Sequence, residues 1–264
     1  MKAHIRGSYI QKTYIAGATI EIMKTYSTRY GKKLPREKNQ KPSPEAVAKY
    51  NEKLAEDTLR RLINENFTYR DYHLVLTYGT GKCPEPPEAK KQLARFLRRL
   101  RAEYRKRGAE LKYVAVTEYK GKRIHHHLVI NRLDDGLFAE CWGYGRPHIT
   151  PLDATGDYAA LAHYLIKETG RTYKDKEGFS KRWSGSKNLS KVEPFVAVIP
   201  ARAWRKKPEV PKKWRNEYIL VEDSVRAGVS EITGYEYQSF RLVRIDGARG
   251  RPVSQSTARR ESDE

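Results

Sequence analysis

The pattern of apolar and polar positions between residues 73 and 169 predicts alternating strands and helices. Residues 73–78 (HLVLTY) form a short apolar run that is typical of a buried strand. Residues 111–119 and 124–130 are also strand-like, and the short link between them predicts a β-hairpin. Residues 88–107 and 157–169 show helical spacing instead. The order β-α-β-β-α predicts an α+β domain, in which helices pack on one face of an antiparallel sheet.

The flanking sequence predicts further elements on both sides of this region. Residues 8–24 are rich in Tyr, Ile and Thr and predict short strands. A helix is expected from Ser43, a good N-cap that is followed by Pro44, to about residue 65. Three more strands are predicted at residues 195–199, 218–222 and 235–245.

Three segments offer few apolar side chains to bury. They are a basic, Pro-containing linker at residues 31–42, a Gly-rich loop at 143–157 and a Gly-, Arg- and Ser-rich tail from about residue 247. The tail is predicted to be disordered.

The net charge of the chain indicates the kind of partner it binds. Lys and Arg number 53 against 32 Asp and Glu, which gives a formal net charge of +21. Such an excess favours a polyanionic partner, with nucleic acid as the first candidate and general solubility as the alternative. The polar face of the helix at 88–107 carries many Lys and Arg residues, and these either face solvent or contact phosphates.

Apolar runs and cysteines limit the class of protein further. No run approaches the roughly 20 apolar residues of a membrane span, so no membrane partner is expected. The first residues lack the apolar stretch of a signal peptide. Cys83 and Cys141 have no metal-site or disulfide-framework spacing, which fits a reducing cytoplasm.

Candidate chemistry lies in the second hairpin strand, where three histidines are consecutive. Alternate residues of a strand share a face, so His125 and His127 point one way and His126 points the other way. If the turn centres between Gly121 and Lys122, Glu118 lies directly opposite His125 and joins the two imidazoles. Two imidazoles and one carboxylate can hold a divalent cation and leave positions open for substrate.

Two other interpretations of the hairpin stay open. The histidines can be ordinary exposed strand residues. A slip of one residue in the register would instead place Glu118 beside His126.

The helix at 157–169 supplies a candidate nucleophile. A helical projection places Tyr158 in the apolar arc, and places Tyr164 and Lys167 outside it as neighbours one turn apart. A nearby ammonium favours the phenolate of a tyrosine, which is otherwise a weak nucleophile at neutral pH. The alternative is an ordinary boundary tyrosine, since the chain has 18 tyrosines.

Taken together, three motifs in this order resemble the HUH endonucleases, and most of all the rolling-circle replication initiators of plasmids, phages and integrative elements. HLVLTY resembles the first motif, with Thr77 at the usual threonine, and RIHHHLVIN resembles the metal-binding motif. AHYLIKE resembles the Tyr-x-x-Lys motif, which carries Tyr164 and Lys167. The central residue His126 departs from the usual apolar or aromatic residue, and Ala160 stands where some phage initiators have a second tyrosine.

The resemblance implies a fold and a domain organisation. It implies an antiparallel, about five-stranded sheet with helices packed against it, related to ferredoxin-like and RNA-recognition folds. The HUH endonuclease domain is expected at residues 70–200, with an N-terminal extension at 1–69 and a basic C-terminal extension at 201–264.

The resemblance also implies a reaction. A metal-dependent nickase would cut single-stranded or hairpin origin DNA, with Mg²⁺ or Mn²⁺ held by His125, His127 and Glu118. Tyr164 would form a 5′-phosphotyrosyl bond, and Lys167 would offset charge on the phosphate. Further candidates for contacts with DNA are Thr77, Arg182, Trp183 and Lys187. Packing against the sheet is the alternative for Trp183.

Other functions would share some of these features. A transposase or mobilisation relaxase of the same superfamily would use the same chemistry. A non-catalytic module that binds single-stranded nucleic acid would need only the basic surface and the aromatic residues, and a metal nuclease would activate a water molecule instead of tyrosine. The sequence contains no phosphate-binding loop of the helicase type, so a host helicase is expected as a partner in a bacterial cytoplasm.

Overall fold

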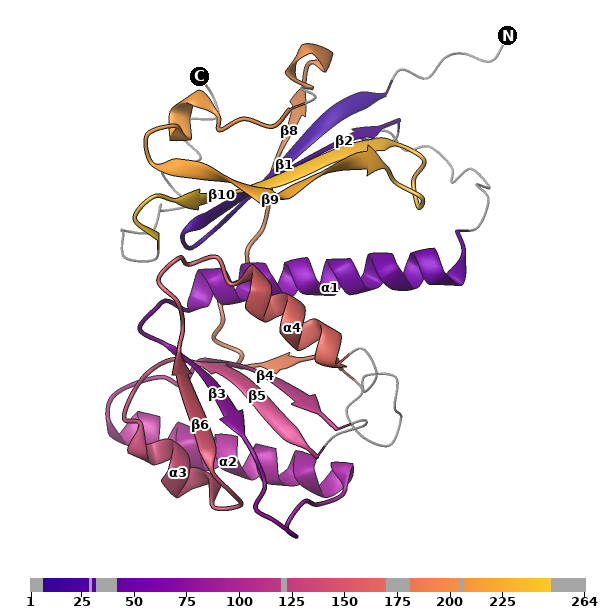
Figure 1. Cartoon of the computed structure of the whole chain (residues 1–264). Helices are drawn as coiled ribbons and strands as arrows, with labels where there is room; N and C mark the ends of the chain where they lie inside the picture. The colour runs from indigo at the N-terminus through magenta and orange to yellow at the C-terminus, as the bar shows by residue number, and fades with distance from the viewer. Residues whose placement is uncertain are drawn as a thin grey trace. The chain divides into compact units, whose positions relative to one another are not determined.

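The computed structural model describes residues 7–28, 30–31, 42–119, 123–169, 181–204 and 207–247. The chain divides into two compact units (Figure 1). The central unit comprises Ala55–Lys191, and the terminal unit combines Met1–Leu54 with Val192–Glu264. The boundary falls inside helix α1 (Pro44–Asn66), close to the helix that the sequence predicts there.

The central unit is built on a five-stranded antiparallel sheet with the strand order β6-β3-β5-β4-β7. Its strands are β3 (Tyr72–Leu76), β4 (Tyr113–Glu118), β5 (His125–Ile130), β6 (Pro147–Pro151) and β7 (Ser184–Gly185). The prediction of an α+β fold with an antiparallel, about five-stranded sheet and packed helices is confirmed.

Helices cover both faces of this sheet, whereas the sequence pattern predicted helices on one face. Helices α2 (Pro86–Lys106) and α3 (Gly136–Trp142) share the first core cluster with Leu74 and Leu128. The last turns of α1 and helix α4 (Ala159–Thr169) share the second cluster with Val116 and Val129 on the opposite face. Figure 1 shows the sheet between these two helical layers.

The second helix of the sheet motif is therefore α3 and not the predicted helix at 157–169. The order β3-α2-β4-β5-α3-β6, with β6 beside β3, is the split βαβ arrangement of ferredoxin-like folds. Both α3 and β6 were missed, because α3 has only seven residues and β6 lies within a segment with the loop-forming residues Gly143, Gly145 and Pro147. Prolines at both ends of β6 are tolerated because it is an edge strand.

The terminal unit contains a second five-stranded antiparallel sheet, with the order β8-β1-β2-β10-β9. Its strands are β1 (Ser8–Ala16), β2 (Thr19–Ser27), β8 (Phe195–Ile199), β9 (Tyr218–Val229) and β10 (Glu236–Arg244). Short 3₁₀ helices span Ala201–Ala203 and Lys212–Trp214. Ile20, Ile22, Phe240 and Leu242 form much of its core.

This sheet changes the expected domain organisation. The segments 1–69 and 201–264 were expected as separate extensions, but strands from both ends of the chain pair in one sheet. Strand β8 was assigned to the domain at 70–200, yet it pairs with β1. The unit that carries the central sheet is Ala55–Lys191 instead.

Three predictions lie wholly or mostly outside the described residues: the linker at 31–42, the hairpin turn at Gly121 and Lys122, and the tail from about residue 247. Across the helices that the structure describes, none combines the length and the apolar character that crossing a membrane requires.

Candidate functional site

The three consecutive histidines of β5 lie in two different environments. His126 is fully buried on the face covered by α2 and α3, where its ring packs against Trp142 at a centroid distance of 5.6 Å. Its two ring nitrogens lie 2.9 Å from the hydroxyl groups of Tyr78 and Thr117. Burial, followed by the neighbouring histidines, lowers the pKa of His126 to about 3, so this imidazole is neutral at pH 7. Its chemistry is that of a satisfied core residue.

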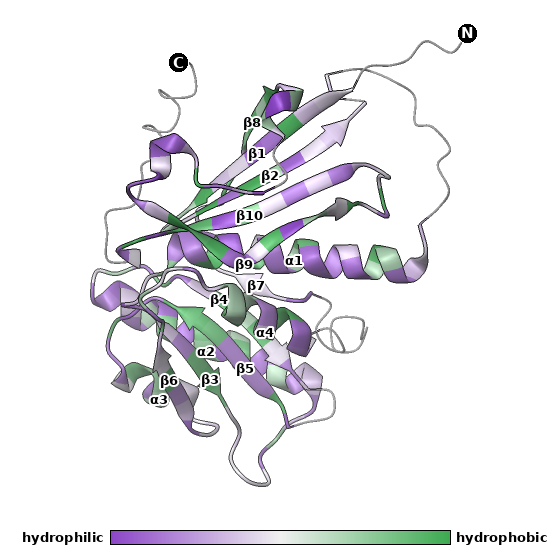
Figure 2. Cartoon of the chain, turned by 45° about the horizontal axis from the view of Figure 1, so that its top comes forward, coloured by the Kyte–Doolittle hydropathy of each residue, from purple (hydrophilic) through white to green (hydrophobic). Residues whose placement is uncertain are grey.

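The hairpin register places the remaining donors together. Glu118 is directly opposite His125, and Val116 is opposite His127, as the predicted turn position required. Residues that are directly opposite share one face of the sheet, so Glu118, His125 and His127 lie on the face opposite His126. The slipped register, with Glu118 beside His126, is excluded. In Figure 2, β4 is largely hydrophobic, whereas β5 begins with the hydrophilic stretch of the histidines.

Glu118 and His127 face each other within this group. The Oε2 atom of Glu118 is 3.8 Å from Nε2 of His127, and both residues are about 95% buried, with 4% and 5% of their surfaces exposed. A buried carboxylate is costly unless a cation or hydrogen bonds compensate its charge. At 3.8 Å the two atoms are too far apart for a hydrogen bond, so a cation bound between them would compensate this charge.

Helix α4 brings the candidate nucleophile to the same face. The ring of Tyr164 meets the ring of His127 edge to face, with a centroid distance of 5.4 Å and an interplanar angle of 82°. Tyr164 is 39% exposed, whereas Tyr158 is only 1% exposed and belongs to the second core cluster. The helical projection predicted this difference. Lys167 is exposed one turn further along α4.

Two contacts hold α4 in this position. The buried side chain of Asn64 on α1 accepts a hydrogen bond from the Tyr158 backbone N–H, with a distance of 3.0 Å. His163 on α4 lies 3.0 Å from the Glu56 carboxylate, also on α1. The first contact fixes the beginning of α4, and the second lies next to Tyr164 in sequence.

Sequence reasoning missed a third histidine on this face of the sheet. His73 on β3 stacks on His127 with a centroid distance of 5.5 Å and an interplanar angle of 18°, and its Nε2 lies 3.3 Å from Nδ1 of His127. Burial lowers the pKa of His73. The only sequence signal was its position two and four residues from Val75 and Thr77, which places all three on one strand face.

In their present positions, Glu118, His125 and His127 do not form a complete site for a divalent cation. Among the described residues, no three His, Cys, Asp or Glu side chains are arranged to hold a metal ion. The 3.8 Å between Glu118 Oε2 and His127 Nε2 nevertheless lies in the range of about 3–4 Å expected for two ligands that each bind one ion at about 2.1 Å. His125 shares this face with them, and its ring centroid is 6.5 Å from that of His127.

The residues that were predicted to contact DNA have varied surroundings. Thr77 donates its hydroxyl to the Arg146 carbonyl, with a distance of 2.8 Å, and Lys187 is exposed. Arg182 and Trp183 are partly buried just before β7, and Trp183 packs against the second core cluster. This packing is the alternative that the sequence left open for Trp183.

Comparison with known proteins relates part of the chain to a protein family. No curated protein and no solved structure shows significant similarity to the chain. Residues 71–169, however, match the model of a family described as replication-associated protein ORF2. This span runs from just before β3 to the end of α4 and contains His73, Glu118, His127 and Tyr164. The match supports a replication initiator-like protein.

Proposed function

We propose that the chain is a rolling-circle replication initiator of the HUH class. In this proposal it nicks and rejoins one strand of single-stranded or hairpin origin DNA through a 5′-phosphotyrosyl intermediate. The observation that carries the proposal is the contact between the Tyr164 ring and His127, on the same sheet face as Glu118 and His125.

Tyr164 is exposed and lies on a helix that is held in place, and a nucleophile needs both. Its ring is accessible, while its helix is held by Asn64 and by the buried residues Leu165 and Ile166. The phenol oxygen attacks the scissile phosphorus, the bond to the 3′ oxygen breaks, and the phenolic proton ends on that oxygen. The products are a free 3′-OH and DNA joined to Tyr164, so the phosphodiester energy is kept and a 3′-OH can reverse the step.

Charge on the phosphate is offset by groups of the chain itself. Lys167 is one helical turn from Tyr164, where its ammonium favours the phenolate and the developing negative charge. His125, His127 and Glu118 would hold Mg²⁺ or Mn²⁺. When bound, such an ion polarises the scissile phosphate. His73 keeps the His127 ring oriented by contacting Nδ1, so that Nε2 stays directed toward Glu118.

The proposal is tested with the full chain and DNA that flanks its coding sequence. Labelled single-stranded oligonucleotides that tile both strands are incubated with Mn²⁺ and separated on a denaturing gel. We expect a heat-stable protein–DNA adduct that is lost with EDTA and in Tyr164→Phe. Tyr50→Phe, which changes an exposed tyrosine of α1, serves as the matched control and keeps the adduct.

Two outcomes would contradict this function. Cleavage that leaves a free 5′-phosphate and no adduct would indicate a nuclease that activates water. Binding of the tiled DNA without any cleavage would indicate a non-catalytic module for single-stranded nucleic acid.

A further inference from the structure

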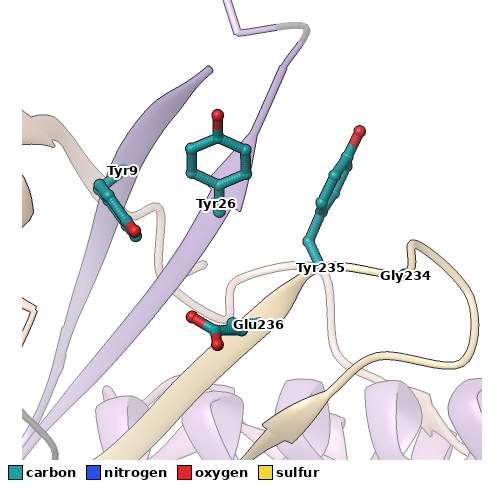
Figure 3. Close-up of a pocket in the computed structure, with 5 residues that line it drawn as sticks. All are labelled: Tyr9, Tyr26, Gly234, Tyr235 and Glu236. Atoms are coloured by element: carbon teal, nitrogen blue, oxygen red, sulfur yellow. The ribbon is translucent and has the colours of Figure 1, made fainter. Parts of the chain in front are cut away.

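The terminal unit carries an aromatic pocket that the proposed reaction does not use. The pocket has a volume of about 290 Å³ and is lined by Tyr9, Tyr26, Gly234, Tyr235 and Glu236. Figure 3 shows the three tyrosine rings and the Glu236 carboxylate around this hollow. None of these residues lies within the span that matches the replication-associated family.

The pocket lies at the open end of a sheet face whose other end is a packed core. Tyr9 on β1 is directly opposite Tyr26 on β2, two residues beyond Lys24, which is itself two residues beyond the buried Ile22. The face therefore passes from apolar core through a polar row to half-buried aromatic rings. The Lys24 ammonium separates the two regions, donating to the Ala203 carbonyl at 3.2 Å.

The tyrosine rings are fixed before any ligand arrives. The Tyr26 hydroxyl accepts the Gly7 backbone N–H at 2.8 Å, and the Tyr235 hydroxyl lies 2.8 Å from that of Thr28. Tyr9 and Tyr26 meet edge to face with ring centroids 5.1 Å apart. A preformed aromatic surface loses little conformational freedom when a flat ligand stacks on it.

Further ring contacts extend this surface on both sides. Tyr235 meets Tyr26 with centroids 5.6 Å apart, and Trp204 packs on Tyr9 with centroids 5.2 Å apart. Because these rings already contact one another, a planar ligand would stack on their outer faces and would not slide between them. A volume near the lower end of ligand sites, about 300 Å³, suits a single ring system.

Charge indicates which planar ligand is suitable. Within Met1–Leu54 and Val192–Glu264, Lys and Arg number 26 against 15 Asp and Glu (26 − 15 = +11), so the unit as a whole attracts a polyanion. The pocket itself presents the Glu236 carboxylate, which repels phosphate and accepts N–H groups. A polyanion with flat, N–H-bearing units is single-stranded nucleic acid.

We propose that this pocket binds an unpaired base of single-stranded nucleic acid. The tyrosine rings stack on the base, and Glu236 accepts hydrogen bonds from its edge. Guanine fits best, since its N1–H and N2–H₂ groups are adjacent donors, whereas the single N–H of thymine lies between two carbonyl oxygens. This second binding site is separate in sequence from the catalytic motifs and does not depend on the proposed nicking reaction.

The test uses the full chain in EDTA, so that binding is measured without cleavage. Single-stranded oligonucleotides of about 12 nucleotides, within the usual site sizes, contain either thymine alone or thymine with isolated guanines. Ultraviolet crosslinking followed by peptide mapping locates the bound base, and fluorescence anisotropy gives the dissociation constants. Crosslinks are expected on peptides that contain Tyr9, Tyr26 or Tyr235.

Two variants and one matched control separate a site from a general effect of charge. Tyr235→Ala is expected to weaken binding of the guanine oligonucleotide roughly 5- to 100-fold, which is the effect of losing one stacked base. Glu236→Gln should remove the preference for guanine over thymine. Tyr237→Ala, on the opposite face of β10 next to Thr25 and Gly228, should leave both quantities unchanged.

Two results would overturn the proposal. If crosslinks map only to Ala55–Lys191, or if Tyr235→Ala binds as the unaltered chain does, the pocket is not a base-binding site. Because cleavage is not measured, a failure of the tyrosine reaction would leave this result untouched, and the reverse also holds.

Discussion

His125, His126 and His127 are adjacent in sequence, yet the strand gives them different roles. His126 is buried between Tyr78, Thr117 and Trp142, while its two neighbours face Glu118 and Tyr164. The alternation of a strand explains this division, because a single residue step reverses the direction of the side chain. The unusual histidine in the middle of the motif replaces an apolar residue by filling the core and pairing both ring nitrogens.

This division predicts opposite effects for two neighbouring substitutions. His126→Ala removes two buried hydrogen bonds and leaves a cavity, so the free energy of unfolding should fall by about 2–4 kcal/mol. His125→Ala should change stability little but lower adduct formation by at least about 100-fold, as expected for a metal ligand. Urea unfolding and the adduct gel measure the two quantities. Undiminished adduct formation in His125→Ala would contradict the assignment of His125 as a metal ligand.

The contact between His73 and His127 allows a second test. If it orients His127, His73→Ala should raise the Mn²⁺ concentration for half-maximal adduct formation by about 10- to 100-fold. His148→Ala is the control, because His148 lies on β6 opposite Val75 and is exposed. Equal Mn²⁺ dependence in His73→Ala and the unaltered chain would show that His73 has no positioning role.

Strand pairing between neighbours in sequence could be predicted, whereas pairing between strands far apart in sequence could not. The register of β4 and β5 follows from a short link, so Glu118 was placed opposite His125 from sequence alone. The pairing of β3 with β5 joins strands about 50 residues apart, and no sequence pattern placed His73 beside His127. Likewise, β1 pairs with β8 across most of the chain, which is why the two ends were expected as separate extensions.

The amphipathic pattern of α4 predicted which of its residues are buried but not which face of the sheet they cover. Its apolar arc correctly separated the buried Tyr158 from the exposed Tyr164. It could not indicate which sheet face receives the arc, because both faces of this sheet carry buried apolar side chains. On the face that α4 covers, the side chain of Asn64 on α1 accepts a hydrogen bond from the backbone just before α4 begins.

Asn64→Ala should therefore affect the reaction without touching Tyr164. It removes a buried hydrogen bond, which costs about 1–3 kcal/mol, and it releases the first turn of α4. Asn66→Ala is the matched control, because Asn66 makes two backbone hydrogen bonds of 2.8 Å to Ser190 instead. At equal loss of stability by urea unfolding, only Asn64→Ala should reduce adduct formation. A reduction of the same size in both variants would mean that general stability is responsible.

The chain combines the candidate nicking site with a second, separate sheet. The central unit, Ala55–Lys191, contains all the residues assigned to nicking, and the terminal unit contains the aromatic pocket. Lys and Arg exceed Asp and Glu by 10 in the first and by 11 in the second (27 − 17 and 26 − 15). The net charge of +21 is thus shared almost equally between the units, as expected if both contact nucleic acid.

Mass spectrometry of the isolated adduct can show whether Tyr164 becomes joined to DNA. After nuclease and protease digestion of the Mn²⁺ reaction, we expect a nucleotide mass on the α4 peptide, with fragment ions that place it on Tyr164. A nucleotide on any other residue, or nicked DNA without a modified peptide, would contradict it.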